Sequence, residues 1–186
     1  DLAQGCQVLL REEIGKGRLG AGGQVDLARL EALYEVVRLD FSVLQDLASE
    51  DAFEAALQRL VSTKFAVAGF RFSSEDAGIP FFDQFGEWLS ALESGSLVLL
   101  VDDFDAPLVS LLDDRVLFEA VSHVLSRFYS VLKANEGRLR FFLMTGSANF
   151  RESSLFSELN CVTDISLNVR YGTMLGFTRE ELEAWF

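Results

Sequence analysis

Two adjacent carboxylates, Asp102 and Asp103, follow the five consecutive apolar residues Leu97 to Val101. An apolar run of this length predicts a buried strand, which would present both acids at its carboxyl end. There the first acid could hold Mg²⁺ directly or through water, and the second could polarise an attacking water molecule. This arrangement is called Walker B. An ordinary buried strand followed by a solvated acidic turn has the same residue types, so the pair alone leaves both interpretations open.

A second apolar run also ends in polar residues. Arg140 to Met144 is followed by Thr145, Gly146 and Ser147. Apolar segments of strand length alternate with helical segments along the chain, and this alternation predicts a parallel sheet with helices on both faces. Ligands of such sheets bind at the carboxyl ends of the strands. We therefore expect an α/β fold with three α/β/α layers and a mainly parallel sheet, with these polar residues clustered where a ligand would bind.

The elements that position these residues are predicted by hydrophobic spacing and by capping residues. Further strands are expected at 36–41 and 162–167, and helices at 49–62, from Pro80 to near Gly95, at 115–134 and from Thr178. Ser49, followed by two acids, is typical of a helix N-terminus, and Thr178 with Glu181 has the capping-box pattern. The helix at 115–134 has an apolar face that should include Val116.

Phenylalanine is unusually frequent, with 17 residues in the chain. Five of them lie between two predicted helices or at the start of the second: Phe70, Phe72, Phe81, Phe82 and Phe85. They could form a surface for a protein partner. A place in the hydrophobic core is the favoured interpretation.

Composition limits the kinds of partner and site. The formal net charge is −13, and such a surface repels nucleic-acid backbones, whereas a magnesium-nucleotide site tolerates it because the metal bridges carboxylates to phosphates. Cys6 and Cys161 are the two cysteines, and no CxxC pair is present, so no zinc site is expected. No leader or membrane-spanning run is visible, and two lone thiols suit a reducing compartment, so we expect a cytoplasmic protein without membrane contact.

A series of segments along the chain resembles the predicted AAA-ATPase-like family. The family's Walker B strand is followed by a D-E-Y-D-x-P-I pattern, and L-T-G, S-x-F-S-x-L-N, T-D-I-S-L and G-F-T-x-E-E-L follow in that order. The matching segments here are Asp102 to Leu108, Leu143 to Gly146, Ser154 to Asn160, Thr163 to Leu167 and Gly176 to Leu182. Their combination and order are specific, and the similarity extends over roughly residues 27–186.

This resemblance implies a P-loop NTPase fold of the ASCE type, which carries an additional catalytic acid. It implies that the strand ending in Asp102 lies next to the strand ending in Thr145. Asp102 would be the acid associated with Mg²⁺, Asp103 the acid that polarises water, and Thr145 the sensor near the γ-phosphate. A Thr-Gly turn that merely closes a strand remains an alternative for Thr145. ATP and Mg²⁺ are the implied cofactors.

The phosphate-binding loop departs from the family pattern. The helix that follows this loop in the family matches Leu27 to Tyr34, and counting back places Gly22, Gly23 and Gln24 at the loop's glycine, lysine and hydroxyl positions. Gly23 cannot neutralise phosphate charge as the lysine does, and Gln24 cannot ligate magnesium as the hydroxyl does. The glycines could still offer backbone N–H groups to an anion.

A phosphate-binding loop could also be located elsewhere. Gly15-Lys16-Gly17, after the apolar Val8 to Leu10, keeps a lysine but has no Ser or Thr after it, and the true loop could instead lie outside this sequence. Asp103 stands where the family has glutamate, and Asn149 stands where it tends to have arginine. Loss of the lysine, the hydroxyl and the arginine would remove most of the electrostatic stabilisation that phosphoryl transfer needs.

The sequence therefore predicts a nucleotide-binding, ATPase-like domain whose hydrolytic activity is undecided. The alternative is an inactive pseudo-ATPase of the same fold that acts as an interaction or regulatory module. In the family a nuclease-like domain often follows, and this module could regulate such a domain. We expect one domain over residues 1–186, rich in loops over residues 1–26, and a fragment of a longer protein.

Overall fold

The computed structural model describes residues 7–12, 34–73, 78–147, 162–166, 168–171 and 178–185. The strands are β1 (Gln7–Glu12), β2 (Glu35–Asp40), β3 (Leu97–Asp102), β4 (Leu139–Gly146) and β5 (Thr163–Asp164). The α-helices are α2 (Glu50–Phe65), α3 (Phe81–Ala91), α4 (Ala106–Val109), α5 (Arg115–Ala134) and α7 (Arg179–Trp185). Short 3-10 helices are η1 (Phe41–Leu44), η2 (Ala66–Ala68), η3 (Glu136–Arg138) and η4 (Val169–Tyr171).

The described strands form one sheet in the order β2-β3-β4-β1-β5. Strands β2, β3 and β4 are parallel, as expected, and β3 lies between β2 and β4. The predicted neighbourhood of the Asp102 strand and the Thr145 strand is therefore confirmed. Strand β1 lies within the stretch expected to be rich in loops and runs antiparallel to both β4 and β5. The predicted strand at 162–167 is confirmed only for the two residues of β5.

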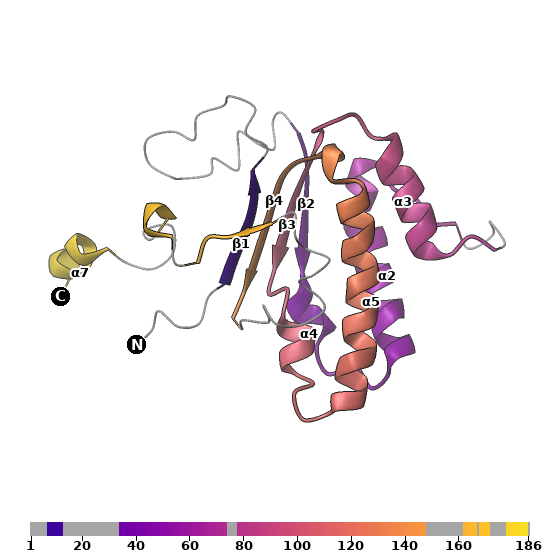
Figure 1. Ribbon diagram of the computed structural model, residues 1–186, viewed down its shortest axis with the longest axis horizontal. Helices are drawn as coiled ribbons and strands as arrows, with labels where there is room; N and C mark the ends of the chain where they lie inside the picture. Colours follow the sequence, from indigo (N-terminus) through magenta and orange to yellow (C-terminus); the bar gives the residue numbers. More distant parts are fainter. Residues whose placement is uncertain are drawn as a thin grey trace.

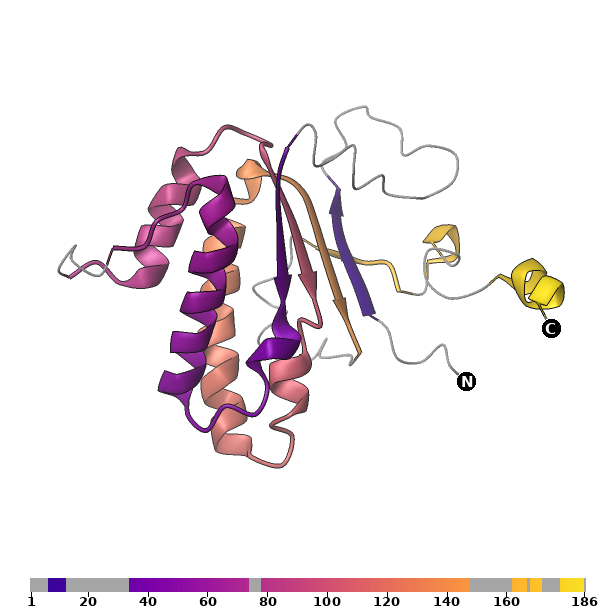
Figure 2. The same cartoon turned by 180° about the vertical axis from the view of Figure 1, so that it is seen from behind.

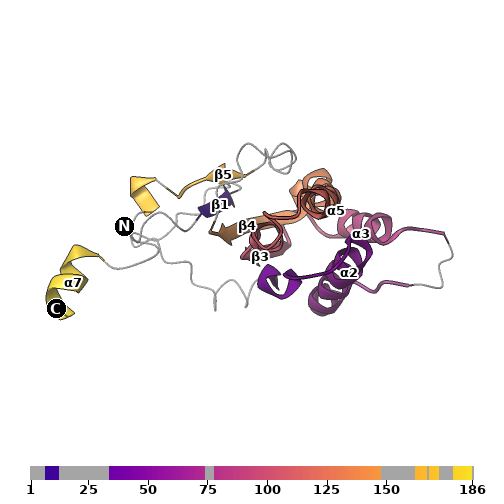
Figure 3. The ribbon, with the colours of Figure 1, turned by 90° about the horizontal axis from the view of Figure 1, so that it is seen from below.

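Helices α2, α3 and α5 lie side by side on one face of this sheet (Figures 1 and 2). The view from below separates the diagonal line of strands from this layer of helices (Figure 3). Every second side chain of the parallel strands points to that layer, which is the alternation that a pleated strand imposes. Val37, Leu99 and Phe142 occupy one row across the sheet in this way, and all three belong to the main hydrophobic core. The described residues thus show two of the three expected layers.

Aromatic side chains fill the space between α2, α3 and α5. Phe70, Phe81, Phe82 and Phe85 are buried, so the core interpretation is confirmed for them, whereas Phe72 is exposed. Phe65 and Phe85 meet edge to face with centroids 4.9 Å apart, and such pairs contribute roughly 0.5–1.5 kcal/mol beyond the area they bury. The high phenylalanine content is therefore largely a property of the core.

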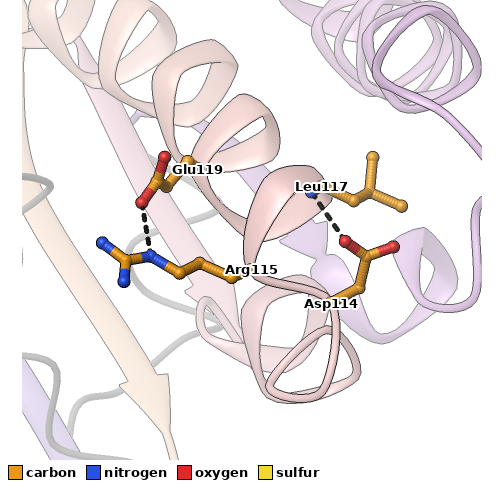
Figure 4. Close-up of polar contacts among 4 residues, drawn as sticks. All are labelled: Asp114, Arg115, Leu117 and Glu119. Atoms are coloured by element: carbon orange, nitrogen blue, oxygen red, sulfur yellow. Dashed lines mark hydrogen bonds and ion pairs between the residues drawn. The ribbon is translucent and has the colours of Figure 1, made fainter.

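Local capping signals set the helix boundaries. The Ser49 side chain accepts a hydrogen bond from Ala52 N at 3.2 Å and begins α2, which continues three residues past the predicted end. Asp114 accepts from Leu117 N at 3.0 Å and begins α5, whose bounds are those predicted (Figure 4). The prediction for Val116 is wrong, because this residue is 81% exposed in the first turn of α5, whereas the next two residues, Leu117 and Phe118, pack against the core.

The C-terminal described segments are short. In α7, Thr178 N donates to the Glu181 carboxylate at 2.8 Å and Glu181 N donates to the Thr178 hydroxyl at 3.2 Å, which confirms the predicted capping box. This helix lies away from the layer of α2, α3 and α5, with the sheet between them (Figures 1 and 3). Among the described helices, none has both the length and the apolar character needed to cross a bilayer.

Candidate functional site at the carboxyl ends of β3 and β4

Asp102 and Thr145 meet at the carboxyl ends of two adjacent parallel strands. Asp102 is the last residue of β3 and is exposed, and Thr145 is half-buried near the end of β4. The Thr145 hydroxyl donates a hydrogen bond to Oδ1 of Asp102. Both side chains lie on the sheet face opposite α2, α3 and α5, because their neighbours in sequence, Val101 and Met144, are core residues on the helical face.

Asp103 begins the turn after β3 with an unusual backbone conformation. Its φ is +50°, in the left-handed region that is rare for residues other than glycine and that Asp and Asn tolerate best. Its backbone N–H donates to Oδ1 of Asp102 at 3.2 Å, and its carbonyl accepts from Ala106 N at 2.9 Å. The two consecutive acids therefore differ in position: Asp102 ends β3, and Asp103 lies in the tight turn that follows.

The surroundings of Asp103 raise the pKa of its carboxyl. Partial removal of water raises this pKa above its ordinary 3.8, and the negative charges of Asp102, Asp105 and Asp40 raise it further. Asp40 ends β2 directly beside Asp102 in the strand register, and its carboxylate accepts from Ser42 N at 2.9 Å. A carboxyl with a raised pKa is a stronger proton acceptor than an ordinary aspartate.

Behind the exposed acids, Asp105 is almost completely buried, with 1% of its surface exposed. Its Oδ2 accepts from Ser147 N at 2.9 Å and from the Ser147 hydroxyl at 3.1 Å. The nearby Tyr129 on α5 is also buried, and burial together with the Asp105 charge raises the pKa of its phenol. Asp105 thus joins the turn after β3 to the end of β4, while Asp102 and Asp103 remain exposed.

The oxygen atoms available at this edge suit a cation such as Mg²⁺ that is bound partly by the protein and partly by a ligand, rather than one bound by protein side chains alone. Among the described residues, no group of three or more His, Cys, Asp and Glu side chains is arranged to hold a metal ion. Carboxylate and hydroxyl oxygens are available from Asp102 and Thr145. Mg²⁺ is usually held by one or two carboxylates together with water and substrate phosphates, so these residues fit that ion when a phosphate ligand supplies further oxygens.

The residues predicted to bind phosphate are not part of this geometry. Gly22, Gly23 and Gln24 lie outside the described residues, as do the alternative Gly15-Lys16-Gly17 and Asn149. Strand β1 precedes that alternative segment, and its last residue, Glu12, pairs with Phe141 near the start of β4. Because β1 is antiparallel, it ends at the edge of the sheet away from Asp102 and Thr145.

Asp40 and Asp105 were not singled out from the sequence. Asp40 is the next-to-last residue of the predicted strand at 36–41, so an acid near the carboxyl end of a strand was the available signal. Asp105 lies in the D-D-F-D-A-P-L segment, but residue type alone does not distinguish a buried carboxylate from an exposed one.

Comparisons with known proteins agree with the resemblance drawn from the sequence. The family model described as Predicted AAA-ATPase matches residues 24–156, a range that includes β2 to β4 and the whole acidic edge. It begins at Gln24 and ends before the Thr163 to Leu167 and Gly176 to Leu182 segments.

One curated relative is described as an uncharacterized protein in the vnfD 5′ region of Azotobacter chroococcum mcd 1. It is 32% identical over 106 residues, which are 55% of this chain and 20% of that protein. The chain thus matches about a fifth of that relative's length. No solved structure matches the chain significantly.

Proposed function

Because the chain belongs to the predicted AAA-ATPase family, we propose that it is a domain that binds a magnesium nucleotide, with ATP as the nucleotide, at the carboxyl ends of β3 and β4. In this proposal the fold is of the P-loop NTPase type. Asp102 is the acid associated with Mg²⁺, Asp103 is the acid that polarises water, and Thr145 is the sensor. Hydrolysis is the proposed reaction if a working phosphate-binding loop completes the site.

The contact between Asp102 and Thr145 carries this proposal. It joins an acid and a hydroxyl from two adjacent parallel strands, at the edge where ligands of such sheets bind. A solvated acidic turn, the alternative interpretation of the sequence, would not require a partner from the neighbouring strand. The contact also orients the Asp102 carboxylate from a rigid element, which is the requirement for holding a phosphate-bound cation in place.

The chemistry of each residue follows from its position. Mg²⁺, when bound, would supply positive charge to phosphate oxygens, and the exposed Asp102 carboxylate would hold it. Asp103 has a raised pKa and is exposed, so it is suited to accept a proton or a hydrogen bond from water. The Thr145 hydroxyl can exchange its bond to Asp102 for one to a γ-phosphate oxygen, and this exchange would make it sensitive to the nucleotide state.

The second candidate is a pseudo-ATPase of the same fold that acts as an interaction or regulatory module. The replacement of the loop lysine and hydroxyl by Gly23 and Gln24 favours it, because these losses weaken both phosphate and magnesium binding. An attached nuclease-like domain is the regulated partner proposed for this case. We also propose that the protein is cytoplasmic and that this domain does not bind nucleic acid.

Thermal unfolding with and without Mg-ATP tests the proposal. A ligand that binds only the folded state stabilises it by about 1.4 kcal/mol at ten times its Kd, which should raise the Tm by about 3–6 °C for a chain of this size. Asp102→Asn should abolish the rise, and so should EDTA. Asp83→Asn is the matched control, since it removes the same charge from an exposed acid on α3 and should keep the full rise.

The outcomes separate the two candidates. A magnesium-dependent rise that Asp102→Asn abolishes supports nucleotide binding, and release of phosphate from ATP then distinguishes the enzyme from the pseudo-ATPase. No rise at millimolar Mg-ATP, with the protein folded, rejects nucleotide binding and leaves the interaction module.

A further inference from the structure

The turn after β3 is attached to the end of β4 by contacts on both sides of Gly146. Phe104 N donates to the Thr145 carbonyl at 3.0 Å, and Ser147 donates to Asp105 through both its backbone N–H and its hydroxyl. Phe104 and Asp105 are both buried. Asp103, which precedes Phe104 in this turn, and Thr145, which precedes Gly146, are two of the residues proposed to act on the ligand.

The Asp105 carboxylate is the polar centre of this attachment. Burying a carboxylate is costly unless hydrogen bonds replace its water, and hydrogen bonds to a charged acceptor are stronger than those between neutral groups. Two donors from one residue, Ser147, converge on Oδ2 of Asp105. The bonds therefore fix the position of Ser147, and through the backbone that of Thr145, relative to the turn.

The packing leaves the turn almost no freedom to move toward β4. A Cβ at Gly146 would lie 2.5 Å from a Phe104 ring carbon and 2.6 Å from Oδ1 of Asp105, distances that real Cβ atoms do not show. The side chains of Phe104 and Asp105 thus pack against the backbone of Gly146 in space that a Cβ would occupy. Movement of this turn toward β4 is therefore blocked, and a displaced turn would have to move away from β4.

We propose that Asp105 is a positioning residue, which holds the turn after β3 against β4 and so sets the geometry of Asp102, Asp103 and Thr145 toward a magnesium nucleotide. This inference rests on the function proposed above. Asp105 is itself buried and bound to Ser147, so it acts on the site through the placement of other residues. Residues that orient metal-binding groups in this way typically change metal affinity about 10- to 100-fold when they are replaced.

The first test does not need a nucleotide. A double-mutant cycle with Asp102→Ala and Thr145→Val, measured by urea unfolding, gives the coupling energy of that contact. The coupling should be present with Asp105 intact and should vanish in an Asp105→Ala background. An unchanged coupling would overturn the proposal. If Asp105→Ala does not fold, Ser147→Ala replaces it, and the coupling should then fall partway, because one of the two bonds to Oδ2 is lost.

The second test compares the Kd for ATP in Mg²⁺ with the Kd in EDTA. Asp105→Ala should weaken binding in Mg²⁺ by about 10- to 100-fold and leave binding in EDTA nearly unchanged. Asp105→Asn should restore binding, because the amide oxygen can still accept both bonds from Ser147. Val61→Ala, a core truncation on α2, is the control for lost stability and should leave the ratio of the two Kd values as in the wild type.

The two tests distinguish failure of the inference from failure of the proposed function. Wild-type protein that binds no Mg-ATP rejects the proposed function, and the coupling measurement still decides whether Asp105 positions the site. An unchanged Kd ratio in Asp105→Ala, or an equal loss in Asp105→Asn, shows that Asp105 does not act by holding the geometry.

Discussion

Replacement of Gly146 by alanine should be strongly destabilising, although the change adds a single methyl group. The new Cβ would lie 2.5 Å and 2.8 Å from two Phe104 ring carbons and 2.6 Å from Oδ1 of Asp105. Both neighbours are buried and belong to the same tight turn, so neither can swing into solvent. Overpacking of this kind costs about 1–3 kcal/mol, and loss of the Phe104 and Asp105 hydrogen bonds to β4 costs about 1 kcal/mol or more each.

We expect the free energy of unfolding to fall by about 2–4 kcal/mol in Gly146→Ala, depending on whether the turn is compressed or moves away. Urea unfolding followed by far-UV circular dichroism measures this difference from the midpoint and slope. Gly86→Ala on α3 is the matched control, because its Cβ would lie 3.5 Å from Val131, an ordinary contact. Alanine in a helix interior should stabilise it by roughly 0.5–1 kcal/mol.

The two substitutions should thus shift the unfolding midpoint in opposite directions. A Gly146→Ala protein within about 0.5 kcal/mol of the wild type, the range typical of surface changes, would refute the close packing of the two strand ends.

Three further predictions concern single side chains. Asp103→Asn should raise the Tm at neutral pH. The raised pKa of Asp103 means that its charged carboxyl destabilises the folded state, so the stability of the wild type falls as the pH rises through that pKa. In a series of melts at different pH values, the gain in Tm should disappear below the ordinary pKa of 3.8. Tyr129→Phe should raise the free energy of unfolding by about 1 kcal/mol in urea, because the buried hydroxyl has no hydrogen-bond partner among the described residues; a loss of that size would show that it has one. Asp114→Ala should cost about 1 kcal/mol through loss of the α5 cap. Glu119→Ala, which breaks an exposed ion pair with Arg115, should cost less than about 0.5 kcal/mol, and equal losses would contradict this ranking.

The sequence by itself determined the local elements around the acidic edge and the family. Five apolar residues before Asp102 predicted β3, and helical spacing predicted α5 with its observed bounds. These features depend on hydrogen bonds and periodicities within a few residues, so they can be recognised without knowledge of the rest of the chain. The resemblance to the family implied that the Asp102 and Thr145 strands are neighbours, as they are.

Only the tertiary structure decided which side chains meet and which are buried. The pairing of Asp40 with Asp102 depends on the strand register, and the antiparallel course of β1 depends on its pairing with β4. Asp105 is buried while its neighbour Asp103 is exposed, because the turn folds back onto β4. These are contacts between residues far apart in the chain, and the same residue types are compatible with several pairings until the sheet and its helices pack together.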